Sequence, residues 1–331
     1  MKVSEIIEKR QPLWRELERL NSRVGGKPTP EVAAKFSRLY RAACADLALA
    51  EAYQLPPNTV DYLHRLVAKS HNQLYRSQKF RWKDWYDKIF FDTPRLIFND
   101  PCIHIATVLF WGLFLLAAYL AWDNTVWPGF AEKVVGEESL ETYKDMYTSF
   151  EGRSGVGGNV NATGFYISHN AGIGLQCFVL MLFVIPGLVV LADNAVQLGS
   201  VFGYMFRPEL GDASINFQNF VTAHGPFELT AIILSAGAGL KIGLSWLMTG
   251  GLSRTDSLLK TARETLPIAM CAVILFIFAA LIEGFVSPTS VDFMPWWVKG
   301  MVGVGSSCGL MFYFVVLGYP HDGIRGTTDA I

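Results

Sequence analysis

The chain has 331 residues, of which 51% are hydrophobic and only 17% charged, against roughly 25% charged in an ordinary soluble protein. This composition excludes a disordered chain and a nucleic-acid-binding protein, and the net charge of −1 indicates no strongly acidic or basic partner. Residues 1–100 carry 18 Lys and Arg against 12 Asp and Glu, whereas nearly all the long apolar runs lie in residues 101–331. The pattern predicts an all-α, polytopic membrane protein with a basic, soluble N-terminal domain.

The N-terminal domain, residues 1–78, is predicted to be a bundle of amphipathic helices, because its apolar residues recur with the 3.6-residue helical period. The three predicted helices cover residues 3–22, 30–53 and 58–77. The apolar stripe of the first includes Leu13, Leu17 and Leu20. The first apolar run begins only at Pro101, so we expect no signal peptide and a domain that stays in the cytoplasm.

Residues 79–100 are predicted to form an amphipathic helix in the membrane interface. Aromatic and basic residues alternate here, directly before the first apolar run, which is typical of helices that lie on an anionic leaflet. These residues are Trp82, Trp85, Tyr86, Phe90 and Phe91 among Lys79, Arg81, Lys83, Lys88 and Arg95. The alternative is one more helix of the N-terminal bundle.

The membrane domain, residues 101–331, is predicted to cross the bilayer about six times. A helix needs about 20 apolar residues to cross. The six predicted crossings cover residues 102–122, 167–185, 187–206, 226–248, 266–287 and 299–319. The helix break between the second and the third is placed at Pro186-Gly187, which leaves almost no loop. This pair is therefore either two tightly connected crossings or a re-entrant pair.

An even number of crossings places both termini on the cytoplasmic side. The basic N-terminal domain then shares that side with Arg254, Lys260 and Arg263, as the positive-inside rule requires. The segment 123–166 carries seven acidic residues against three basic ones, so it is predicted to be an extracytoplasmic loop.

Ionisable side chains within apolar helices are costly and mark candidate functional sites. The polar residues predicted at the outer ends of the crossings are His169, Asn170, His224, Glu228 and Glu283. His224 and Glu228 are four residues apart and so share one helix face. We expect His224, Glu228 and Glu283 to lie within hydrogen-bonding or ligand distance of one another. Asn170 should lie close enough to orient one carboxylate.

Three hypotheses account for these residues, and none identifies a catalytic residue. The favoured one is a structural polar clamp, in which Glu228 faces the positive end of the helix dipole and His224 bonds to a carboxylate. The second is a zinc site, because zinc accepts imidazole nitrogens and carboxylate oxygens, although no zinc-hydrolase motif is present. Its ligands would be His169, His224, Glu228 and Glu283, and zinc is the one cofactor considered. The third is a path for a substrate or a proton.

Other polar and small residues have structural explanations. Asp193 and Asn194 lie within the third predicted crossing, where hydrogen bonds between helices would hold them. Lys241 is expected to extend to the cytoplasmic interface. Gly239 and Gly243 permit close helix packing, either inside the protein or in a dimer seam.

The chain resembles the stage II sporulation protein M family of bacterial integral membrane proteins. The family pattern contains a His-Gly-x-x-Glu-Leu-x-Ala-Ile run, which matches 224–232, and an Ile-Glu-x-Phe-x-x-Pro ending, which matches 282–288. A Leu-x-x-Asn element matches 191–194, and the whole resemblance covers about 165–290. Two positions depart from the pattern: His169 replaces the first Asn of a pair, and Ala195 replaces a Gly.

The resemblance implies a multi-pass protein of the bacterial inner (cytoplasmic) membrane that anchors or scaffolds peptidoglycan-degrading enzymes of the cell envelope. The expected partners are the lipid bilayer, envelope enzymes, cytoplasmic proteins and a further copy of the chain, but not nucleic acid. A non-catalytic role is favoured. The alternative is a membrane-embedded metal-dependent enzyme or transporter that uses the outer His/Glu cluster.

Overall fold

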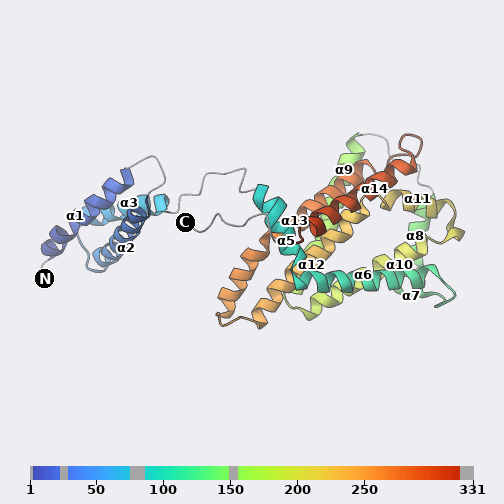
Figure 1. Cartoon of the computed structure of the whole chain (residues 1–331), viewed down its shortest axis with the longest axis horizontal. Coiled ribbons are helices and arrows are strands. Elements are labelled where there is room, and N and C mark those ends of the chain that lie inside the picture. The colour runs from blue at the N-terminus through green and yellow to red at the C-terminus, as the bar shows by residue number, and fades with distance from the viewer. Residues whose placement is uncertain (1–2, 23–28, 75–85, 149–155, 321–331) are drawn as a thin grey trace. The chain divides into compact units, whose positions relative to one another are not determined.

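The architecture is known from a computed structural model, in which all regular structure of the described residues is helical, as predicted (Figure 1). The residues that it describes are 3–22, 29–74, 86–148 and 156–320. The chain divides into two compact units, residues 1–81 and 82–331. Each unit is described separately below.

The described residues of the first unit form three helices, and segments that contain Gly or Pro follow the first two. The helices are α1 (Val3–Ser22), α2 (Pro30–Ala52) and α3 (Pro57–Leu74). Their shared core includes Trp14, Leu17, Phe36, Leu39, Leu63 and Leu66. Trp14 is buried and its Nε1 donates a hydrogen bond to Asp46 at 2.8 Å. The prediction that Leu13 belongs to the core is wrong: the side chain is 38% exposed, because the neighbouring Trp14 takes the inward position.

The segment predicted as an interfacial helix is described only from Tyr86 onward. It contains the π-helical turn η1 (Lys88–Asp92) and the short helix α5 (Thr93–Phe98). Trp82 and Trp85, on which the prediction partly rests, lie outside the described residues. The interfacial location stays a prediction.

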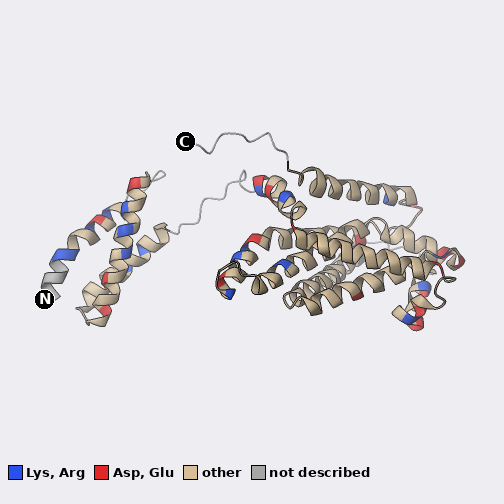
Figure 2. Cartoon of the chain, turned by 60° about the horizontal axis from the view of Figure 1, so that its bottom comes forward, with Lys and Arg blue, Asp and Glu red and all other residues tan. Residues whose placement is uncertain are grey.

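Among the described residues of the second unit, five helices are long and apolar enough to cross a membrane. They are α6 (Pro101–Trp122), α10 (Ile185–Met205), α12 (Gly225–Leu247), α13 (Arg254–Phe285) and α14 (Trp296–Met311), which continues into η3 (Phe312–Val316). They coincide with five of the six predicted crossings. Charged residues gather at the ends of these bundle helices, as Figure 2 shows.

The sixth predicted crossing belongs to α9 (Val156–Met181), which is more polar and is not among those five. It nevertheless packs against both α12 and α13. At one end, Asn170 bonds to Glu283 of α13, and at the other, Gly243 of α12 lies directly against the backbone of Met181. Asn170 and Met181 are 11 residues apart, or roughly 16 Å along a helix, against a hydrocarbon core of about 30 Å, so the two connected crossings stay a prediction.

The turn between α9 and α10 is formed by residues 182–184, and Val184 there has a φ of 58°. The predicted helix break at Pro186-Gly187 is therefore wrong by a few residues. Pro186 instead stands in the first turn of α10, where its missing N–H has no helical partner to lose. A Cβ on Gly187 would clash with the backbone of Met181, so the tight connection requires glycine.

The segment 123–166 is not the loop that its acidity suggested. It contains α7 (Phe130–Val135), α8 (Glu137–Thr148) and the first part of α9. The amphipathic α8 buries Leu140 and Tyr147 and packs against α11 (Asp212–Val221), which follows the 3₁₀ turn η2 (Pro208–Leu210). We call α7, α8 and α11 the helical cap, and the end of the bundle that carries it the cap pole.

The opposite end of the bundle, the loop pole, carries the turn 248–253 between α12 and α13. The start of α6 lies there, since Asp100 contacts Lys241 near the end of α12. The end of the last helix lies there too, since the rings of Phe98 and Tyr319 are in contact at 5.9 Å. The bundle thus begins and ends at the same pole.

The central helix is α12, which packs against α6, α9, α13 and α14. Nearly every residue from Ala231 to Gly243 is buried. Gly239 and Gly243 face the backbone of α9, at Phe178 and Met181. The helix face formed by these two glycines therefore packs inside the protein. Of the two alternatives, internal packing and a dimer seam, the structure shows internal packing.

Candidate functional site

The start of α12 and the end of α13 meet the middle of α9 at the cap pole and bring four of the predicted polar residues together. His224 directly precedes α12, with Pro226 in the first turn of the helix and Glu228 one turn in from its start. Glu283 lies near the end of α13, and Asn170 lies on α9. We call Asn170, His224, Glu228 and Glu283 the polar cluster.

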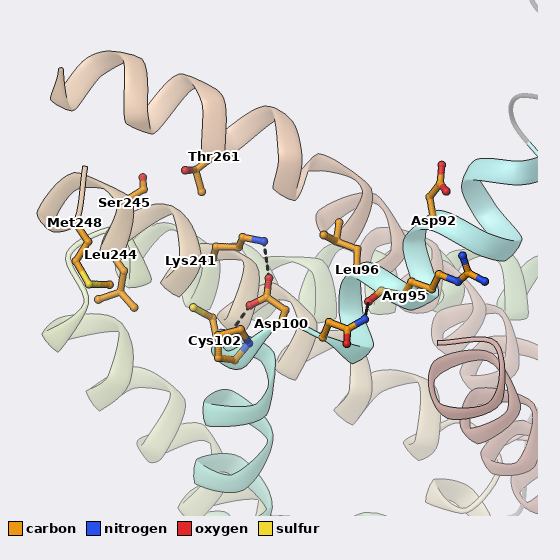
Figure 3. A pocket seen from close by; sticks show the side chains of 12 residues that line it. Asp92, Arg95, Leu96, Asp100, Cys102, Lys241, Leu244, Ser245, Met248 and Thr261 are labelled. Carbon is orange, nitrogen blue, oxygen red and sulfur yellow. Dashed lines mark hydrogen bonds and ion pairs between the residues drawn. The ribbon is translucent and has the colours of Figure 1, made fainter. Parts of the chain in front are cut away.

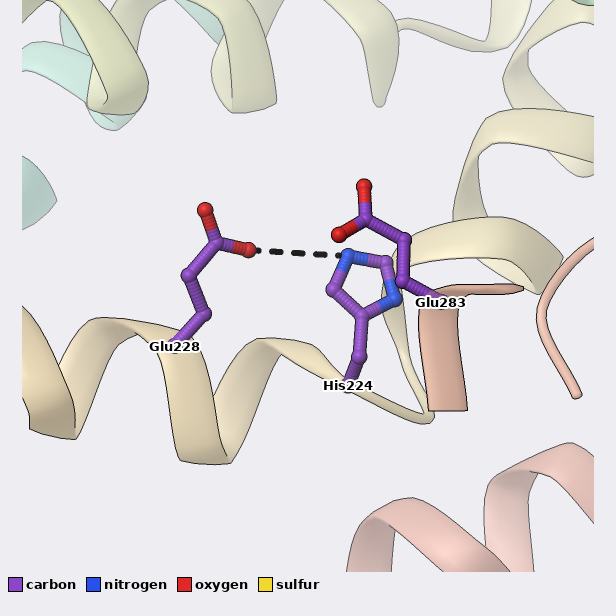
Figure 4. Close-up of side chains that lie close together, drawn as sticks. All are labelled: His224, Glu228 and Glu283. Carbon is purple, nitrogen blue, oxygen red and sulfur yellow. Dashed lines mark ion pairs between the residues drawn. The ribbon is translucent and has the colours of Figure 1, made fainter. Parts of the chain in front are cut away.

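Figure 4 shows the side chains of His224, Glu228 and Glu283 pointing toward one another. Nε2 of His224 lies 3.7 Å from Oε2 of Glu228, and Nδ2 of Asn170 donates a hydrogen bond to Oε2 of Glu283 at 3.1 Å. One possible ligand atom from each of His224, Glu228 and Glu283 lies within 4.8 Å of the others. His224 and Glu283 are only 4% and 8% exposed, so the cluster is well shielded from its surroundings.

Two further residues that the sequence analysis missed hold the cluster in place. Nδ1 of His224 lies 2.9 Å from Oγ of Ser287, in the segment just after α13. The buried Lys299 of α14 donates hydrogen bonds to the backbone carbonyls of Ser287 and Thr289, at 2.8 and 2.7 Å. Lys299 is the one charged residue in the apolar sequence of α14. A single charged residue in an apolar helix is the sequence feature that could have identified Lys299 as a candidate site residue.

The helical cap covers the polar cluster with aromatic side chains. Phe220 of α11 contacts the His224 ring at 5.4 Å between centroids, and Tyr147 of α8 contacts both Phe217 and Phe220. Burial, together with nearby groups that include Glu283, raises the pKa of the Tyr147 phenol. A phenol of ordinary pKa is already neutral at physiological pH, and burial favours that neutral form of Tyr147 further.

The remaining predicted residues lie apart from the cluster. His169 is exposed and stacks on Phe165 at 5.8 Å, so it is not a fourth member. Asp193 is exposed. Asn194 donates to the Val190 carbonyl at 2.9 Å and lies 3.9 Å from Sγ of Cys177 on α9, which places it between helices.

A second polar group lies at the loop pole (Figure 3). Nζ of Lys241 contacts Oδ2 of Asp100 at 2.6 Å, while Oδ1 of Asp100 caps α6 by accepting a hydrogen bond from the backbone of Cys102. The pair lines a cavity of about 590 Å³ together with Arg95 and Thr261. The side chain of Lys241 thus reaches the carboxylate at the start of α6, and its extension to the cytoplasmic interface stays a prediction.

The fold and the polar cluster define a polytopic helical membrane protein with a buried acid–imidazole group at one pole. The sequence model of the family described as Stage II sporulation protein M matches residues 106–288, more than half of the chain. The chain belongs to this family. Residues 4–76 match a family described only as a domain of unknown function. Comparisons with curated proteins and with solved structures found no match.

Proposed function

We propose that the protein is a non-catalytic anchor in the bacterial inner membrane for enzymes that remodel the envelope, peptidoglycan-degrading enzymes above all. Its family membership supports a membrane protein of this kind. The observation that carries the proposal is the helical cap, an ordered helical layer at the cap pole. The cap offers a defined surface for another protein.

The exposed face of α8 is the part of the cap that we propose as the contact surface. Leu140 and Tyr147 fix this helix against the rest of the unit, which leaves Glu138, Glu141 and Met146 exposed on its outer side. Acidic side chains around an exposed methionine give a mixed polar and apolar surface, as protein interfaces do. The first unit, residues 1–81, would bind cytoplasmic partners.

A photo-crosslinking amino acid at position 141 tests the anchor proposal in native membranes. We expect it to form a defined adduct that contains a peptidoglycan-remodelling enzyme, identified by mass spectrometry. The matched position is Val108 of α6, 73% exposed on an apolar face of the bundle, which should crosslink to no such enzyme. Identical adducts from both positions would contradict the proposal. A membrane-embedded enzyme or transporter, the alternative function, requires no partner at α8.

Membrane orientation is a separate part of the proposal. Arg254, Lys260 and Arg263 follow the turn 248–253 at the loop pole, so the positive-inside rule favours a cytoplasmic loop pole. The cap pole and α8 would then face outward. The first unit and the chain end would both lie in the cytoplasm.

Cysteine labelling of intact cells checks this orientation, in a background whose native cysteines are replaced by alanine. With a membrane-impermeant maleimide, we expect Ser139→Cys on α8 to be labelled in intact cells. Leu252→Cys in the turn should be labelled only after the membrane is permeabilised. Both positions are exposed, and Leu252→Cys leaves the Ser253 cap of α13 intact. Labelling of the second variant alone would reverse the orientation.

A further inference from the structure

The polar cluster has the composition and spacing of a three-ligand metal site. We propose that His224, Glu228 and Glu283 bind one divalent transition-metal ion, with zinc the best match to these ligands. Their ligand atoms lie within 4.8 Å of one another, and ligands around a tetrahedral zinc ion lie roughly 3.4 Å apart. Small side-chain rotations close that difference. The proposal is independent of the anchor function.

The charges of the cluster favour a divalent cation. Glu283 is almost fully buried beside Glu228, and two carboxylates that share a buried site repel each other and lose hydration. Within the described part of the chain, neither glutamate forms an ion pair with a lysine or arginine. The nearby ammonium group of Lys299 is directed at backbone carbonyls instead. Protonation of His224 would balance one negative charge, whereas a divalent ion balances both.

Residues around the three ligands are arranged as they are in metal sites. A metal-binding histidine usually bonds through its second ring nitrogen to a neighbouring polar group, which fixes the ring orientation. Here Nδ1 of His224 lies 2.9 Å from Oγ of Ser287, so Nε2 faces the carboxylates. Asn170 donates to one oxygen of Glu283 and leaves the other oxygen available as a ligand.

The ligand set also distinguishes among metals. Calcium takes six to eight oxygen ligands and magnesium requires a near-octahedral set of oxygens. One imidazole and two carboxylates suit zinc better, and three protein ligands leave a fourth position for water. Cysteine is absent from the group, which disfavours a thiolate-bound metal.

The test uses the full-length protein in detergent, stripped with a chelator and then titrated with ZnCl₂ or MgCl₂. We expect about one zinc ion per chain by elemental analysis and a higher melting temperature with zinc than with magnesium. Co²⁺ in place of zinc should give the strong visible absorption of a tetrahedral site. Wild-type protein that is folded by circular dichroism but takes up no zinc overturns the proposal.

Variants locate the ion. Glu283→Gln and Glu228→Gln remove a buried negative charge but keep a hydrogen-bonding side chain, so they should fold without metal and bind zinc more than about 100-fold more weakly. Ser287→Ala removes the group that orients His224 and should weaken binding by about 10- to 100-fold and change the Co²⁺ spectrum. Glu141→Gln on the exposed face of α8 is the matched control and should bind normally. Undiminished zinc binding by a folded Glu283→Gln protein also overturns the proposal.

Discussion

Replacing Gly239 with leucine is expected to prevent α12 from packing against α9 and to destabilise the membrane unit by about 3 kcal/mol or more. This is the upper part of the range for overpacked cores. A side chain at this position would clash with the backbone carbonyl of Phe178. Backbone atoms of a buried helix cannot move aside as a flexible side chain does, so the two helices must separate.

The matched control is Gly112→Leu in α6. Gly112 is exposed, and a Cβ there meets nothing within 4 Å. Its replacement should change stability by only about 0.5 kcal/mol, as most surface substitutions do. Thermal unfolding in detergent, followed by circular dichroism, measures both variants. If they melt together, the close approach of α12 and α9 is not required for stability.

Replacing Lys241 with methionine is expected to destabilise the membrane unit by about 3 kcal/mol. Removing one partner of a buried ion pair leaves the other charge uncompensated, at a typical cost of about 3–5 kcal/mol. Asp100 keeps only 2% of its side chain exposed, and the 25% exposure of Lys241 places the effect at the lower end of that range. The exposed Lys260→Met variant should be close to neutral.

A double-mutant cycle separates the ion pair from other effects. Asp100→Asn keeps a side-chain oxygen that caps α6, since asparagine is as good an N-cap as aspartate. Combined with Lys241→Met, it removes both charges and should recover most of the lost stability. A coupling energy above about 1 kcal/mol in unfolding experiments is expected for contacting residues. Additive effects of the two substitutions would show that the pair contributes little.

Helices with regular apolar spacing and strong end signals could be predicted closely from the sequence. α1, α2 and α3 lie within a few residues of their predicted bounds, because glycine or proline follows α1 and α2 and proline begins α2 and α3. The helical cap was not predicted, because the many acidic residues of segment 123–166 are typical of an exposed loop. In addition, α8 is stabilised by the packing of Leu140 and Tyr147 in the contact with α11. Tertiary contacts of this kind cannot be predicted from the local sequence.

The polar cluster was only partly accessible from the sequence. The four-residue spacing of His224 and Glu228 places them on one helix face, and the number of crossings brings Glu283 to the same pole. His169 and Asn170 are adjacent on α9, where successive side chains point about 100° apart. Only one of them can face the interior, and the sequence did not show that it is Asn170. Ser287 and Lys299 support the polar cluster through contacts with residues far away in the sequence. The spacing of residues along the chain does not predict such contacts.

The short turn between α9 and α10 has a consequence for how the protein enters the membrane. No lysine or arginine lies between Arg153, just before α9, and Arg207, just after α10, so the turn that joins the two helices carries no positive charge to hold it on one side. α9 is too polar to be among the apolar spans, whereas α10 meets that standard. We therefore expect the two helices to insert together as a hairpin. In a chain truncated after Met181, we expect that α9 does not insert stably into the membrane. Membrane insertion of α9 would then require that α10 has already been synthesised.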